Sequence, residues 1–417
     1  MNKRLTLNTS VQLALFFFLL MCLLPKSGYH AGDMSCWSWW TQFIGEKNLG
    51  GIYSYSVNYQ PLFLYGLALF ERILDTPEKI TESIHYVRII PILFDLVPVL
   101  FLLAIRKFRE LASGWHWFLL LNVAYLYNSV IWGQVDSIHS SLSLLALILS
   151  LRYPVWSAWV FILAFNVKFQ SIIFLPLLII TWISAVRSWK QAAGMLLGGL
   201  ALETLILLPF LLAGTFPAYL KMASGAVGYF PYISMNAFNL WDLLLDDMTI
   251  YSVRDDEIFL LVSYKTAGLI LFFLFSALIL FPAFIKSLVA IIKRRVYLKI
   301  WELVFLSAGL IAVAFFFFNT QMHERYSHPA MVFFFFYSVY RRNFLLYGLT
   351  SLAYLLNMER ILVFFDISYH TVIFEKEFIA SLFALVLILG IARLVSAYAL
   401  REDLIFLKAT FNRQKVK

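Results

Sequence analysis

Long apolar runs are the feature that most constrains this chain. Ile258 to Ile285 is almost uninterrupted, and Leu303 to Phe318 contains no charged residue. A membrane-crossing helix needs roughly 20 apolar residues, or about 17 at the short end. Apolar residues make up 62% of the 417 residues and charged residues 14%, so a soluble fold would lack the polar residues that cover a protein surface. We therefore expect an all-α, polytopic integral membrane protein.

These runs predict about 12 spans in one transmembrane domain that covers residues 1–417. The predicted spans are 5–24, 88–105, 115–131, 137–151, 153–167, 168–185, 192–213, 258–285, 300–318, 328–340, 344–357 and 377–398. The first span follows Lys3-Arg4, as the apolar part of a signal peptide would. No small-residue cleavage site comes after it, so we expect an uncleaved span.

Two long loops interrupt the predicted spans, the first at residues 25–87 and the second at 214–257. The first long loop contains amphipathic stretches at Trp37–Phe43 and Pro61–Leu74. We expect interfacial helices there, because Trp and Tyr favour the depth of the lipid headgroups. The alternative, that 61–74 is itself a span, is disfavoured by the charged pair Glu71-Arg72 near its end.

The distribution of Lys and Arg predicts the orientation in the membrane. With both termini cytoplasmic, about 21 Lys and Arg residues fall on the inner side and about 12 on the outer side, as expected for loops that stay in the cytoplasm. The inner residues are clustered at 106–109, 293–295, 341–342 and 408–417. The net charge of +9 is thus a topology signal, and no nucleic-acid partner is expected.

Polar and charged residues in the predicted outer loops and at the outer ends of predicted spans gather on one side of the membrane under this orientation. They are Asp33, Asn58, Arg88, Asp95, Gln134, Asp136, His139, Lys168, Gln170, His323, Glu324 and Arg325. Charged groups at membrane depth are costly and commonly mark functional sites. Carboxylates, a histidine and cations around one outward-open cavity would suit removal of a hydroxyl proton and binding of a phosphate.

Each candidate also has a structural explanation. Asp33 can be a helix cap or a solvated loop residue, and Asp136 and His139 lie one helical turn apart and can pair with each other. Lys168 can extend to the interface, as lysines near span ends commonly do. Residues 323–325 can cap a span. No HExxH, CxxC, P-loop or GxGxxG motif is present.

Five motifs together resemble the GT-C superfamily of glycosyltransferases, and in particular bacterial relatives of the GPI-anchor mannosyltransferases. They are Gly32-Asp33-Met34 with Trp37, Trp40 and the Asn58–Tyr65 stretch; Trp132–Ser137, similar to the family's WGQxD; Lys168-Phe169-Gln170; Asn236-Ala-Phe-Asn239-Leu-Trp241; and Met322–Tyr326. Asn58 stands where relatives often have Asp, and Gln60 replaces a proline. The first departure removes one possible base and concentrates the expectation on Asp33.

The resemblance implies a GT-C fold and an inverting transferase that moves a hexose, mannose or glucose, from a polyprenyl-phosphate donor to an acceptor hydroxyl. Mannose is favoured, and the acceptor is a glycan, a lipid or a protein. It also implies roles for individual residues. Asp33 would be the catalytic base; Lys168, His323, Arg325 and Arg88 would bind the donor phosphate; Gln134, Asp136, Asn58, Gln170 and Glu324 would bind sugar or acceptor. The expected location is the bacterial inner membrane, with the site facing the periplasm.

No cofactor is expected, although Asp33, Asp136 and Glu324 are oxygen ligands that would suit a divalent cation. Two other functions are open at this point. A transporter or flippase of lipid-linked saccharides would typically have two related halves with broken helices near the membrane midplane, and no half-to-half similarity is visible. A membrane scaffold without catalysis would not need these charged residues.

Overall fold

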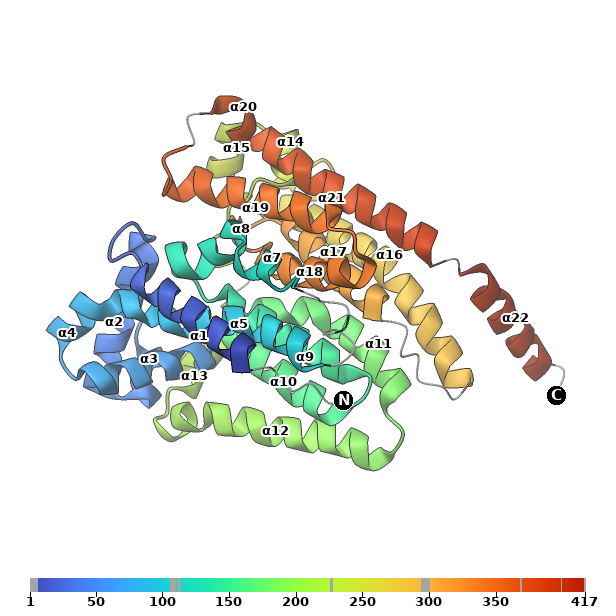
Figure 1. Ribbon diagram of the computed structural model, residues 1–417, viewed down its shortest axis with the longest axis horizontal. Helices are drawn as coiled ribbons and strands as arrows, with labels where there is room; N and C mark the ends of the chain where they lie inside the picture. Colours follow the sequence, from blue (N-terminus) through green and yellow to red (C-terminus); the bar gives the residue numbers. More distant parts are fainter. Residues whose placement is uncertain are drawn as a thin grey trace.

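The structure is a computed structural model that describes residues 7–105, 110, 114–225, 228–293, 301–367, 370–398 and 400–415. Within these residues the protein is almost entirely helical (Figure 1). Short strands form two small sheets. β1 (Ser234–Met235) pairs in parallel with β4 (Met322–His323), and β2 (Ile258–Phe259) pairs antiparallel with β3 (Val262–Ser263).

Five helical segments of the described chain are long and apolar enough to cross a membrane. They are Pro77–Ala104, which ends in α5 (Ile89–Ala104), α12 (Trp189–Leu212), α16 (Tyr264–Ile292), α17 (Trp301–Phe318) and α21 (Lys376–Ala397). Shorter apolar helices lie at Thr9–Cys22, Asp136–Ser150, Pro154–Val167 and Phe169–Ala185. The expected all-α class is confirmed, and these helices indicate a membrane-embedded protein.

The remaining predicted spans also correspond to helices, with two differences. The matching helices are α1 (Leu7–Cys22), α9 (Asp136–Ser150), α10 (Pro154–Val167), η4 with α11 (Phe169–Phe174 and Leu175–Ala185), α18 (His328–Arg341) and α19 (Leu345–Leu362). The basic residues at 106–109 and 294–295, on which the orientation partly depends, lie outside the described residues.

The predicted span at 115–131 is wrong as a single helix. The structure has three short pieces there, α7 (Trp117–Leu120), α8 (Val123–Leu126) and the π-helix η3 (Tyr127–Trp132). Asn122 causes the break: its side-chain oxygen accepts a hydrogen bond from the Tyr125 N–H and so begins a new helix. Its amide group donates to hydroxyls of α19, which holds the broken segment against that helix.

The first six residues of the predicted span 258–285 are also not helical. They form the β2–β3 hairpin, and α16 begins only at Tyr264, where the Ser263 side chain caps its first turn. This boundary could not be predicted from the sequence, because the hairpin is apolar and a continuous apolar run does not show where a strand ends and a helix begins.

The first long loop is mostly helical and packs on itself. It contains α2 (Ala31–Lys47), η1 (Leu49–Ser54), α3 (Pro61–Leu74), α4 (Pro77–Ser83) and η2 (Ile84–Arg88). The predicted helix over 61–74 is confirmed, with Pro61 at its first position, where the missing N–H has no cost. Trp37 is 1% exposed and its ring lies 5.0 Å from that of Phe63. Trp37 therefore belongs to the core between α2 and α3, whereas Trp39 of the same helix is exposed.

The central helices of the fold are α17 and α18, which lie among α16, α19 and α21 (Figure 1). The phenylalanine run 333–336 of α18 is buried against this core. By contrast, α12 lies at one edge and exposes leucines along its length, and α22 (Arg401–Lys415) extends at the C-terminal end. The connection between α17 and α18, residues 319–327, is largely buried and carries His323, Glu324 and Arg325.

Candidate active site

Asp136 lies at the first position of α9, after a tight turn at Gly133. Gly133 has φ +91°, a left-handed conformation that favours glycine. A Cβ atom added there would overlap Met34 Cε and lie 3.1 Å from Arg88 Cδ. The turn therefore needs glycine for its backbone and for its close approach to α2. It places Asp136 and Trp132 beside the first long loop.

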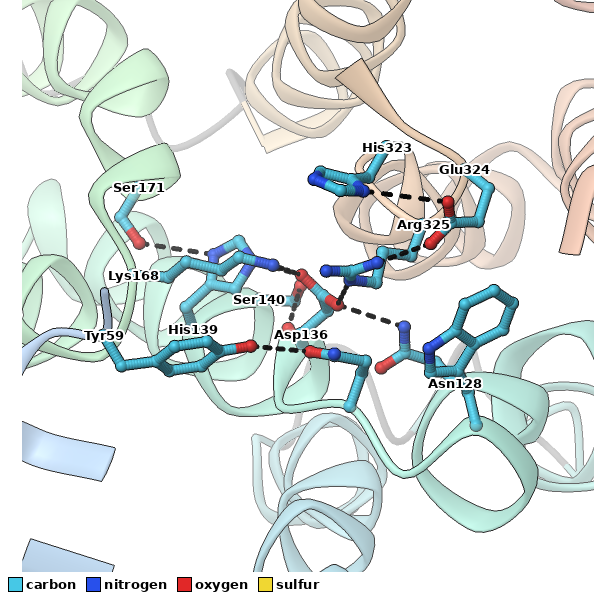
Figure 2. Close-up of polar contacts among 12 residues, drawn as sticks. Tyr59, Asn128, Asp136, His139, Ser140, Lys168, Ser171, His323, Glu324 and Arg325 are labelled. Carbon is cyan, nitrogen blue, oxygen red and sulfur yellow. Dashed lines mark hydrogen bonds and ion pairs between the residues drawn. The ribbon is translucent and has the colours of Figure 1, made fainter. Parts of the chain in front are cut away.

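Asp136 is the centre of a buried polar cluster, which we define as Asn128, Asp136, His139, Lys168, Glu324 and Arg325 (Figure 2). The Asp136 carboxylate is fully buried. Lys168 Nζ donates to its Oδ1, and Asn128 Nδ2 donates to its Oδ2 at 3.1 Å. His139 Nε2 lies 3.4 Å from Oδ1 and Arg325 Nε 4.0 Å from Oδ2. A buried carboxylate requires such partners, because an unpaired charge in a protein interior is very costly.

Lys168 ends α10 in an extended conformation, which turns its side chain into the polar cluster. Its ammonium group lies 4.6 Å from the centre of the Tyr326 ring and its side chain is 13% exposed. This geometry combines an ion pair with a cation–π contact. The alternative in which Lys168 extends to the membrane interface does not describe this structure.

Glu324 and Arg325 form an ion pair in the connection between α17 and α18. Burial opposes ionisation of both groups. Their mutual attraction outweighs it, so that the pKa of Glu324 is lowered and that of Arg325 is raised well above its ordinary value. Arg325 Nε is buried and has no hydrogen-bond partner in the described residues. Arg325 therefore has an unsatisfied cationic donor next to Asp136.

The Asn236–Trp241 motif supports this connection rather than contributing to the polar cluster. Asn239 Nδ2 donates to the carbonyls of Phe316 and Asn319 at 3.0 and 3.2 Å. Trp241 Nε1 donates to the carbonyl of Phe318 at 3.1 Å. These bonds satisfy carbonyls at the end of α17 that have no partner within the helix. The β1–β4 pairing then fixes the backbone at His323.

Asp33 lies in the first turn of α2, at the accessible edge of this region. Its Oδ2 accepts a hydrogen bond from Trp132 Nε1 at 2.9 Å and lies 2.8 Å from His30 Nδ1. Burial raises its pKa, but Arg325, His30 and Trp132 outweigh burial and hold the pKa well below the ordinary range. Asp33 is therefore an ionised carboxylate, and its side chain is 22% exposed.

The other expected site residues have different environments. Gln134 is buried, and its Oε1 accepts from the Tyr59 hydroxyl at 2.9 Å while its Nε2 has no partner among the described residues. Gln170 is buried, and neither polar atom of its side chain has a partner in that same set. Asn58 is exposed. Within the Asn58–Tyr65 stretch, its neighbour Tyr59 reaches the site through the bond to Gln134.

Arg88 is fully buried and is held by the backbone. Its three nitrogens donate to the carbonyls of His85 (2.9 Å), Val130 (2.8 Å) and Pro25, and its guanidinium lies 5.3 Å from the Tyr29 ring. Because each of its nitrogens donates to a backbone carbonyl, Arg88 ties the first long loop to η3. We assign it to this packing rather than to phosphate binding.

Three aromatic or imidazole side chains of the site were not expected from the sequence: His30, Tyr59 and Tyr326. Tyr59 and Tyr326 lie inside the recognised motifs, so their position was a usable signal. His30 precedes Asp33 by three residues, which is the spacing of an N-cap on the first turn of a helix. Its Nδ1 contacts both the Asp33 backbone N–H, at 3.3 Å, and the Asp33 carboxylate.

The region is closely packed rather than an open cavity. Asp136, Gln134 and Glu324 are nearly or fully buried, and among the charged groups and histidines the exposed fraction is highest at His30 and Asp33. The described residues contain no group of three or more His, Cys, Asp and Glu side chains arranged to hold a metal ion. Chemically, the arrangement offers an accessible carboxylate–imidazole pair in front of two buried cations, Lys168 and Arg325.

No protein-family model matches the chain, and no curated protein matches it at a significant level. The chemistry of these residues is therefore the basis for assigning a function.

Proposed function

We propose that this chain is an inverting GT-C glycosyltransferase that moves a hexose from a polyprenyl phosphate to an acceptor hydroxyl. One observation carries the proposal: residues from four of the five recognised motifs meet in one region. Asp33 comes from the first motif, Asp136 from the second, Lys168 from the third and Arg325 from the fifth. The fourth motif supports the backbone of the fifth.

The charges of the region support a transfer in which a phosphate leaves. Negative charge develops on the leaving phosphate, and fixed cations nearby stabilise it. Arg325 has a free Nε donor, and Lys168 is close by on the other side of Asp136. Both cations are held in place by carboxylates, so they are oriented before the donor binds (Figure 2).

The unpaired amide groups support recognition of a polyhydroxylated ligand. Buried polar atoms almost always have hydrogen-bond partners, so each exception needs an explanation. Gln134 Nε2 and both polar atoms of Gln170 are such exceptions in the described residues. A bound sugar, which presents donors and acceptors around its ring, would satisfy these amides.

We further propose about 12 spans, one of which is the broken segment 115–132, with both termini in the cytoplasm. The first long loop and residues 319–327 then lie on the periplasmic side of a bacterial inner membrane. A lipid-linked donor suits this arrangement, because its isoprenoid chain stays in the bilayer while its phosphate reaches the polar cluster at the outer ends of the helices.

The test is transfer of radiolabelled sugar from synthetic short-chain polyprenyl-phosphate mannose and glucose into membranes that contain the protein. We expect transfer from one donor with the wild type and its loss with Asp33→Asn. Asp75→Asn is the matched control, since Asp75 is an exposed aspartate of the same loop in a left-handed conformation that Asn tolerates. Folded wild-type protein that transfers neither sugar to any acceptor fraction would contradict the proposal.

A further inference from the structure

His30 is fixed in one orientation at the accessible edge of the site. It is the N-cap residue of α2, in an extended conformation that directs its ring back over the first turn. Its ring stacks on Trp132, with centroids 5.0 Å apart and planes 15° apart. Trp132 and His30 contact the same oxygen of Asp33. The imidazole is thus held on one face by an indole and on one edge by a carboxylate.

The contact with Asp33 determines which ring nitrogen carries the proton. Asp33 is ionised, so an Nδ1 that lies 2.8 Å from its Oδ2 must carry the hydrogen. The 3.3 Å approach of the Asp33 backbone N–H to the same nitrogen is then not a hydrogen bond, because a protonated Nδ1 has no lone pair to accept it. The lone pair of a neutral His30 is therefore on Nε2. In the described residues Nε2 has no partner, and the side chain is 41% exposed.

Asp33 itself is poorly suited to receive a proton. Its Oδ2 already accepts from Trp132 and His30, and the field of Arg325 further stabilises the ionised form. A general base works best when its pKa lies near the working pH. The hydrogen bond with Asp33 raises the pKa of His30 above its ordinary 6.5, and Glu324 acts in the same direction, while burial and Arg325 oppose them.

We propose that His30 Nε2 is the atom that accepts the proton of the acceptor hydroxyl, and that Asp33 is a positioning residue for this imidazole. The assignment rests on the proposed function. It differs from the expectation based on resemblance, in which Asp33 is the base. The geometry supports it because His30 Nε2 faces no described residue on a side chain that is 41% exposed, whereas Asp33, at 22% exposed, directs Oδ2 to His30 and Trp132.

In the transfer step, His30 takes up the acceptor proton and the lipid phosphate takes up the electron pair of the broken bond. The acceptor oxygen forms a bond to the anomeric carbon as its proton moves to His30 Nε2. The bond between the anomeric carbon and the phosphate oxygen breaks on the opposite face, and its electron pair leaves on the lipid phosphate. Asp33 stabilises the imidazolium, which returns its proton to water before the next turnover.

The test uses three variants of the full-length protein and two independent readouts. His30→Gln removes the base, Asp33→Asn removes its orienting partner, and His85→Gln is the control. His85 is a histidine of the same loop that contacts Tyr86 and whose backbone carbonyl, retained in the variant, binds Arg88. Sugar transfer is measured from pH 5 to 9, and ¹⁵N chemical shifts of the histidine rings report the tautomer in each protein.

We expect His30→Gln to lower kcat by about 10²–10⁴-fold with little change in KM, the usual contribution of a general base. The wild-type and His85→Gln proteins should lose kcat/KM below an inflection above pH 6.5, the ordinary pKa of histidine. The residual activity of His30→Gln should lack that inflection. The Nδ1–H tautomer of His30 should be present in the wild type and lost in Asp33→Asn.

Three results would overturn the assignment. If wild-type activity is flat across the acid range, or if folded His30→Gln keeps full activity while Asp33→Asn loses it, Asp33 is the base. A neutral His30 that carries its proton on Nε2 would also exclude His30 Nε2 as the proton acceptor. Failure of the proposed function looks different, because the wild-type protein would then transfer no sugar at any pH.

Discussion

The ion pair between Lys168 and Asp136 allows the energetics of the polar cluster to be tested without any substrate. Lys168→Met keeps most of the side-chain volume and removes the ammonium group that binds Asp136. Asp136 is fully buried and the Lys168 side chain is 13% exposed, so few water molecules can reach the Asp136 carboxylate and hydrate it once the ammonium group is removed. Removing one partner of a buried ion pair typically destabilises a protein by about 3–5 kcal/mol.

We expect a value at the low end of that range, about 3 kcal/mol. His139 Nε2 at 3.4 Å and Arg325 Nε at 4.0 Å remain close to the carboxylate and partly compensate its charge. The double variant Lys168→Met/Asp136→Asn should recover much of the loss, because it leaves no unpaired charge. The two substitutions should therefore be strongly non-additive, as residues in contact are.

The assay is unfolding of the purified protein by SDS in mixed micelles, followed through its 12 tryptophans. Lys221→Met serves as the control, because Lys221 is exposed on α13 (Phe216–Gly225). If Lys168→Met unfolds at the same SDS fraction as the wild type and the control, the carboxylate does not depend on Lys168. If the double variant is as unstable as the sum of the single variants, the pairing argument fails.

Three further predictions concern residues around the site. Gly133→Ala should destabilise the protein by more than about 1 kcal/mol in the same unfolding assay, because the methyl group would overlap Met34 and the backbone is left-handed; a neutral result would refute the packing of this turn. Arg88→Lys should lower the stability of the protein, because the Arg88 nitrogens bind backbone carbonyls. The variant protein that remains folded should have an unchanged KM for the donor. An increase in KM without a loss of stability would indicate that Arg88 binds the donor phosphate. Burial raises the pKa of Asp242 from 3.8 to about 7, so the folded state holds this proton more tightly than the unfolded state. Its contribution to stability is full below about pH 4 and is lost as the pH rises through about 7. Asp242→Asn should remove this part of the pH dependence, and identical pH profiles of the two proteins would contradict it.

Much of the helical framework could be predicted from the sequence, because the length of an apolar run indicates whether a helix can cross the membrane. The helix at 61–74 was predicted at its observed bounds from its amphipathic pattern, and in the structure Pro61 occupies its first position. The break at Asn122 could not be predicted in this way, because it depends on hydroxyls from α19, more than 220 positions away in the chain. The β2–β3 hairpin was missed because its residues are as apolar as the helix that follows.

The candidate site was predictable where its residues lie in motifs. Asp136, Lys168, Glu324 and Arg325 were all expected on chemical grounds, and the structure brings them together. A phosphate role for Arg88 was expected from the resemblance, whereas in the structure its carbonyl partners come from three separate places in the chain. His30 had no motif, and its importance depends on the stacked Trp132, about 100 residues later.

The most direct test of the central claim is a product analysis with purified protein in sealed vesicles that contain a polyprenyl-phosphate hexose. Mass spectrometry would follow the glycosylated acceptor and the free polyprenyl phosphate, and NMR would give the anomeric configuration of the new bond. We predict equimolar appearance of both products, with the configuration inverted relative to the donor, and their loss in His30→Gln. Movement of intact donor across the bilayer without any new glycosidic bond would contradict the account and favour a transporter.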